Sequence, residues 1–228
     1  MKRMIFLISL VVLQLVALAG NPDDKDKFGR RYEDKITSGG LTLNAEADAF
    51  WIYSIPGFES SPGLGLSFGG FVDFKVTPRF VIQMSLLLNR CQSFIENASF
   101  VDGRNSFTSY GMEIPLVFMA RFRFQRAGIL YVGAGPYTEF VFRSQLVNGD
   151  EVVDPYHQVV GVDNSGMDVF ALSNNNSGLK VKLCYELPCR LQFHATAGLS
   201  ISDILGYAHS DAFVRPYKTA IGISYRIR

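Results

Sequence analysis

The sequence is short of the residues on which most enzymes and metal proteins depend. Its 228 residues include 3 histidines and 3 cysteines. The cysteines, Cys91, Cys184 and Cys189, are odd in number and do not have the spacing of a metal site. No phosphate-binding or dinucleotide-binding glycine motif is present. We therefore expect no catalytic residue, no cofactor and no metal. We also expect free thiols, although Cys184 and Cys189 flank one hairpin and a disulfide between them is the alternative.

An excess of charge of one sign is also missing. The chain has 22 basic and 21 acidic residues, and without Lys2 and Arg3 the basic count falls to 20. Proteins that bind nucleic acid normally carry a concentrated basic face, so we expect no nucleic-acid partner.

Long hydrophobic runs are absent after the N-terminus. Residues 4–18 form a short apolar run that follows two basic residues and ends in the cleavage pattern Ala17-Leu18-Ala19. This arrangement predicts a cleaved signal peptide over residues 1–19, with an uncleaved anchor as the alternative. Residues 20–39 are polar and predict a flexible periplasmic lead-in. An exported, hydrophobic chain without a helical span favours a transmembrane β-barrel over residues 40–228.

What the sequence does have is alternation. In "LTLNAEADAFWIY", residues 41–53, apolar and polar side chains alternate with the period of a β-strand. Seven further segments follow this pattern, over residues 63–76, 80–89, 110–122, 130–143, 179–186, 191–200 and 217–227. Eight strands predict an all-β, eight-stranded antiparallel up-and-down transmembrane β-barrel.

The connections alternate in length. Those around residues 77–79, 125–127 and 188–190 are tight, and the longest runs from about Ser144 to Asn176. Short periplasmic turns and long outer loops are typical of outer-membrane barrels, and an even strand number places both termini on the short-turn side. Pro115 lies within a strand, where proline removes a ladder hydrogen bond, and therefore predicts a β-bulge.

A soluble lipocalin-like barrel that binds an apolar ligand has the same strand number but an apolar interior. Two features favour the inverse arrangement. First, aromatic residues of the apolar face gather at the strand ends around an aliphatic band, as at the two interfaces of a bilayer. They are Trp51, Tyr53, Tyr110, Phe140, Phe142 and Tyr217 at the long-loop end, and Phe74, Phe80, Phe118, Phe122, Tyr185, Phe193 and Tyr225 at the other, with Phe68 as an exception near mid-strand.

Second, the polar face carries both signs of charge. Its acids are Glu46, Asp48, Asp73, Glu113, Glu139 and Glu186, and its bases are Lys75, Arg121, Arg143, Lys180, Lys182 and Arg226. Buried charges are tolerated when they are paired, and an eight-stranded interior is narrow enough for side chains to fill it. We therefore expect a plugged polar lumen.

Two motifs carry a family resemblance. Glu113-Ile114-Pro115-Leu116 is followed, across a short turn, by Tyr131-Val132-Gly133-Ala134-Gly135-Pro136, and Gly63-Leu64-Gly65 precedes both. The chain resembles the PorT-like small outer-membrane barrels of Bacteroidetes-type bacteria. The resemblance implies an eight-stranded barrel over residues 40–228, and one group of that family is linked to type IX secretion. The chain departs from the family at its end, Tyr225-Arg226-Ile227-Arg228, which lacks a terminal aromatic residue.

The histidines do not assemble a catalytic pattern. His194 is expected in the lumen beside Gln192 and Thr196, where a hydrogen-bond network is its ordinary role, and His157 and His209 are expected in outer loops. The leading hypothesis is a non-enzymatic, monomeric barrel that contacts outer-membrane lipid and has a structural role in the envelope, or binds envelope or secretion-complex proteins through its loops. The alternative is a lipid-modifying enzyme with a site at the rim.

The expected orientation of the strands has a direct test. Arg in place of Ile114 would face hydrocarbon and should cost about 2–4 kcal/mol of stability, whereas Arg in place of Thr196 would enter the lumen and should cost less if it meets a carboxylate. Denaturant unfolding in lipid bilayers measures both. An Ile114→Arg barrel as stable as the wild type would show that the orientation is wrong.

Overall fold

The computed structural model describes residues 37–53, 59–96, 104–124, 128–148, 151–156, 160–162, 168–170, 172–204 and 213–227. The expected signal peptide, and the lead-in as far as residue 36, lie outside the described residues. The first strand begins at Thr37, three residues before the expected start of the barrel. In the described part of the chain, no helix has the length and apolar character needed to cross a membrane.

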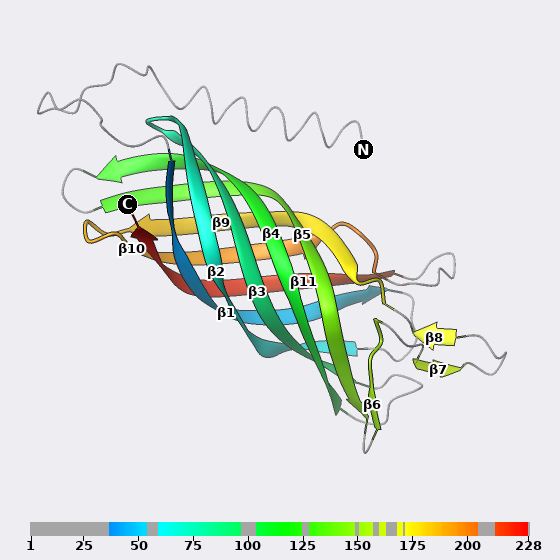
Figure 1. Cartoon of the computed structure of the whole chain (residues 1–228). Coiled ribbons are helices and arrows are strands. Elements are labelled where there is room, and N and C mark those ends of the chain that lie inside the picture. Colours follow the sequence, from blue (N-terminus) through cyan, green and yellow to red (C-terminus); the bar gives the residue numbers. More distant parts are fainter. Residues whose placement is uncertain are drawn as a thin grey trace, which may run out of the picture.

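Eight long strands form a closed antiparallel ring, as the alternation predicts (Figure 1). In ring order they are β1 (Thr37–Tyr53), β2 (Glu59–Thr77), β3 (Phe80–Glu96), β4 (Arg104–Phe124), β5 (Gly128–Asn148), β9 (Asn175–Glu186), β10 (Leu191–Ser200) and β11 (Phe213–Ile227). The last strand pairs along its whole length with the first, from Gly39 with Ile227 to Tyr53 with Phe213. Closure leaves no sheet edge exposed to lipid.

The expected loop after the fifth strand contains further structure. β5 continues to Asn148 and pairs with β6 (Glu151–Val153), and β7 (Val160–Val162) pairs with β8 (Asp168–Phe170). The strands also differ in length, since β4 and β5 have 21 residues each and β10 has 10. Figure 1 shows β3, β4 and β5 continuing towards the end of the barrel where β6, β7 and β8 lie. The wall is therefore extended on one side at its long-loop end.

The exposure of the side chains decides which face is outside. Leu43, Met84 and Val181 are 51%, 46% and 54% exposed on the outer surface. Their polar neighbours face the lumen and are buried, as Glu46 and Glu113 are. The apolar face therefore covers the cylinder, which confirms the orientation and excludes a lipocalin-like interior.

The aromatic residues follow the expected distribution with one correction. Trp51, Tyr53, Phe142 and Tyr225 are more than half exposed, at opposite ends of the outer surface. Phe80, expected to face lipid, is instead buried, as is Val81 beside it. Phe80 directly follows the tight turn, next to a register shift between Lys75 and Thr77, so the alternation of the strand does not extend to it.

The β-bulge expected at Pro115 is not there. The pairing of β4 with both neighbours keeps one register on either side of Pro115, although residues next to it lack ladder partners. The irregularity lies between Tyr110 and Gly111, opposite Arg143 and Val141 of β5. The extra residue reverses the faces of β5 beyond it. Arg143, expected in the lumen, is therefore exposed, while Ser144 is buried.

Two apolar clusters lie inside the barrel. One fills the long-loop end and combines strand residues with residues of the connections; it consists of Phe50, Ile95, Phe107, Leu146, Leu172, Ile204 and Val214. The other consists of Val81, Val117, Met119, Tyr131 and Cys184. The ring of Phe107 packs against Phe50, with 5.3 Å between centroids. The interior is therefore polar along much of its length and closed by apolar side chains at its outer end.

Candidate functional site

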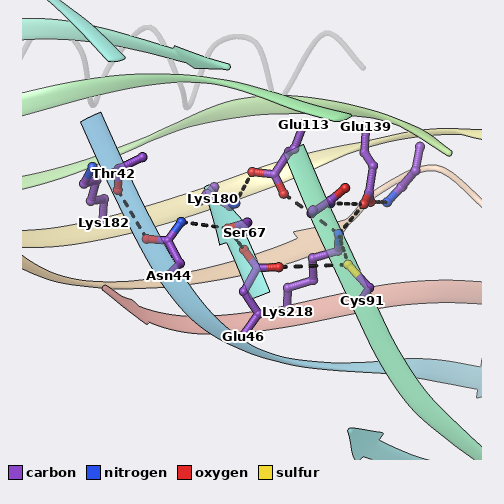
Figure 2. Close-up of polar contacts among 12 residues, drawn as sticks. Thr42, Asn44, Glu46, Ser67, Cys91, Glu113, Glu139, Lys180, Lys182 and Lys218 are labelled. Atoms are coloured by element: carbon purple, nitrogen blue, oxygen red, sulfur yellow. Dashed lines mark hydrogen bonds and ion pairs between the residues drawn. The ribbon is translucent and has the colours of Figure 1, made fainter. Parts of the chain in front are cut away.

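The candidate site is the lumen, where the inward positions of the strands place charged side chains in two ion-pair clusters. The first, called here the outer cluster, lies nearer the long-loop end. In it, Lys180 of β9 pairs with Glu113 of β4, and Lys218 of β11 pairs with Glu139 of β5 (Figure 2). The two pairs are linked, because Lys218 Nζ also lies 4.0 Å from Glu113 Oε2. Asn89 Nδ2 donates to Glu139 Oε1 at 2.7 Å. Each of these pairs crosses the lumen between strands that are not neighbours.

A second cluster is centred on Arg226, near the short-turn end of β11. Its guanidinium lies 2.6 Å from Asp73 Oδ2 and 3.1 Å from Glu186 Oε2. Gln83 Nε2 donates to the other Asp73 oxygen at 2.7 Å, and Tyr131 Oη donates to Glu186 at 3.0 Å. All of these residues are at most 7% exposed. Charge-assisted hydrogen bonds of this kind offset the cost of burying charge.

His194 lies between the clusters and uses both ring nitrogens. Its Nε2 is 2.6 Å from Asn44 Oδ1, and its Nδ1 is 3.2 Å from Ser224 Oγ. Because Asn44 Nδ2 donates to Ser67 Oγ at 2.8 Å, Asn44 Oδ1 is the acceptor and His194 Nε2 carries the proton. Gly222 makes room for this contact, since a Cβ there would lie 2.2 Å from Asn44 Oδ1.

Ser224, His194 and Asn44 are connected in the order of a hydroxyl, imidazole and amide relay, which raises the question of hydrolysis. Hydrolysis by these three buried side chains would also require space for a substrate next to them. The lumenal cavity that His194 and Asn44 line together with Lys180 and Lys182 has a volume of about 30 Å³, the space of one or two waters. No acyl chain or headgroup fits there, so the arrangement serves as a hydrogen-bond network, as expected for His194.

The other expected site residues fall in different places. Most of the charges assigned to the lumen are buried there, and Lys75 and Lys182 are half-buried. Cys91 points into the lumen, where Lys218 Nζ lies 3.3 Å from its sulfur. Cys184 is buried, and Cys189 is exposed in the β9–β10 turn. His157 and His209 lie outside the described residues.

Sequence reasoning missed two features of the interior. The first is the pair of Lys218 with Glu139, since the two residues are 79 positions apart and only ring closure brings them together. The apolar cluster at the outer end was also missed. Its signal is a loss of alternation, since Phe50 and Ile52 place apolar side chains on the face that is polar at Glu46 and Asp48.

The outer rim is held by aspartates that bind backbone. Asp154 accepts from the backbone nitrogens of Ser144 and Tyr156, at 3.3 and 3.1 Å. Asp203 accepts from the Val214 nitrogen at 2.9 Å. These bonds fix the starts of the long connections against the strands, above the apolar cluster.

The ion pairs of the outer cluster predict a strong, asymmetric response to mutation. Lys180→Met leaves the buried Glu113 with Lys218, 4.0 Å away, as its remaining ion-pair contact. This variant should destabilise the barrel by about 3–5 kcal/mol. Lys180→Met combined with Glu113→Leu removes both charges and should recover most of that loss. Denaturant unfolding in lipid vesicles measures both variants, and additive effects would show that the pair is not coupled.

Comparison with known proteins supports the same architecture. A family profile described as "Outer membrane protein beta-barrel domain" matches residues 54–206, from the connection after β1 to the connection after β10. Among curated proteins, no sequence matches the chain.

Several solved structures of outer-membrane proteins align with most of the chain. The outer membrane protein OprG from Pseudomonas aeruginosa is 12% identical, with a TM-score of 0.47, over 84% of this chain and 94% of that one. Ail of Yersinia pestis is 11% identical with a TM-score of 0.41, over 85% and 100% of the two chains. Neisserial surface protein A is 14% identical with a TM-score of 0.42, over 84% and 99%. The profile match covers most of the chain, so the protein belongs to the outer-membrane β-barrel domain family and is a small barrel of the bacterial outer membrane.

Proposed function

We propose that this protein is a non-enzymatic, non-conducting barrel that presents its long-loop end to a partner in the cell envelope. The observation that supports the proposal is the filled lumen. Ion pairs cross it, a cavity of about 30 Å³ remains beside His194, and the apolar cluster around Phe107 closes its outer end. A lumen of this kind leaves no continuous water path for an ion or a solute.

The long-loop end has the features of a binding platform. The extension of β4 and β5 raises one side of the wall, and β6 adds a further strand to β5 there. Binding residues are commonly placed on loops that a rigid scaffold positions. Envelope or secretion-complex proteins fit this end as partners, since the rest of the outer surface is apolar and faces lipid.

The resemblance to PorT-like barrels of Bacteroidetes-type bacteria favours a secretion-accessory role among these partners. In the same proposal residues 1–19 are a cleaved signal peptide, the following polar residues lie in the periplasm, and the barrel is monomeric. The protein contacts outer-membrane lipid and no nucleic acid. The rim-sited lipid-modifying enzyme gains no support from the site, because His194 is enclosed in the lumen.

The non-conducting lumen is tested by reconstituting the folded barrel in planar lipid bilayers. We expect no discrete conductance steps above the bare membrane, while a porin inserted in the same membranes gives them. Stable, reproducible steps from the wild-type barrel would contradict the filled lumen and favour a transport role.

The binding role is tested in cells by crosslinking. We expect crosslinked envelope partners to be lost when residues 157–171 of the longest connection are replaced by a short Gly-Ser linker. A barrel altered in the same way at the 125–127 turn, on the opposite side of the membrane, is the control. Equal crosslinking by both variants would contradict the assignment to the long-loop end.

A further inference from the structure

Asp48 is a buried charge that the lumenal network leaves without a partner. Its side chain points inward from β1, and the residue is 5% exposed. Within the described ranges, neither carboxylate oxygen has a hydrogen-bond partner. An isolated carboxylate in such a place is costly, so it must take up a proton or a cation.

Asp48 lies in a cluster with two further ligand groups. Glu46 is two positions earlier on β1, on the same face, and Cys91 comes from β3. One ligand atom of each residue lies within 4.8 Å of the others. Glu46 Oε2 is 3.9 Å from Cys91 Sγ, and Figure 2 shows both side chains pointing towards Lys218.

The glycines of β2 explain how β1 and β3 come so close. β2 lies between these strands and presents Gly63 opposite Asp48 and Gly65 opposite Glu46. A Cβ on Gly65 would lie 2.7 Å from Asp48 Oδ2 and 3.3 Å from the Cys91 Cα. The absence of side chains on these inward positions therefore opens the space in which the three groups meet.

The ion pairs of the neighbouring cluster do not include the two acids of this space. Glu113 pairs with Lys180 and Glu139 pairs with Lys218, whereas no ion pair engages Glu46 or Asp48 within the described strands. Lys218 Nζ lies 3.3 Å from Cys91 Sγ, and a thiol that binds a metal gives up its proton. Two carboxylates and a thiolate suit a borderline-soft cation such as Zn²⁺ better than Mg²⁺ or Ca²⁺, which prefer oxygen ligands alone.

We propose that Glu46, Asp48 and Cys91 bind one divalent transition-metal cation of the zinc class inside the lumen. The thiol proton is released to solvent when the metal binds, and Lys218 stays on Glu139. The cation neutralises two carboxylates that have no ion pair in the described strands and joins β1 to β3 across the glycine positions of β2. Cysteine spacing alone gives no sign of the site, because its ligands come from two separate strands.

The test uses Co²⁺ as a spectroscopic probe on the full-length barrel. Co²⁺ is present throughout refolding into detergent micelles under reducing conditions, so that access to the closed lumen does not limit loading. We expect one Co²⁺ per barrel and a thiolate-to-cobalt charge-transfer absorption. Both should disappear in Cys91→Ser, and Co²⁺ should bind Asp48→Asn at least tenfold more weakly.

Cys184→Ser is the matched control, since Cys184 is also buried and inward but lies in the apolar cluster of Val81 and Tyr131, away from the proposed site. It should keep the absorption and the affinity of the wild type. Heat-modifiable gel mobility establishes that each variant is folded, and Asp48→Asn decides the question if Cys91→Ser is not. Absence of the absorption in the wild type, its persistence in folded Cys91→Ser, its loss in Cys184→Ser, or unchanged affinity in Asp48→Asn would overturn the proposal.

Discussion

The structure depends on one constraint: hydrocarbon offers no hydrogen-bond partner, so every polar group at membrane depth must be satisfied within the protein. The backbone meets this constraint by ring closure, with β1 against β11 and β4 against β5. The side chains meet it by turning inward, where acids and bases of opposite strands pair. The same alternation that places Leu43 in lipid places Asn44 in the lumen, so lipid contact and lumen filling are one property of the sequence.

The filled lumen follows from the size of the ring. Eight strands enclose a space that side chains can span. Pairs such as Lys180–Glu113 therefore connect strands that are not hydrogen-bonded neighbours in the ring. The apolar cluster around Phe107 then separates this polar interior from the long connections above it. A barrel closed in this way has its variable, accessible surface at the rim, which is where binding to other envelope components is proposed.

The sequence predicts the ring, its strand order and its orientation because these depend on a local period. It fails where one residue changes that period. An extra residue in β5 near Val141 turns Arg143 out of the lumen, and Phe80 leaves the lipid face beside a turn. Proline predicts a β-bulge less reliably than expected, since β4 continues through Pro115 without a change of register. Contacts across the lumen, such as Glu46 with Cys91, depend on three-dimensional proximity and on the glycines between them, which no short sequence pattern reports.

The central claim is that apolar side chains coat the barrel, and the single tryptophan of the sequence allows a direct measurement. A barrel with Trp51→Phe and Leu86→Trp carries its tryptophan near the middle of β3, at an outward position that is 51% exposed. In bilayers of lipids brominated along the acyl chains, the account predicts blue-shifted emission that the bromines quench strongly. Red-shifted emission quenched by aqueous acrylamide, and unaffected by the brominated lipid, would contradict it.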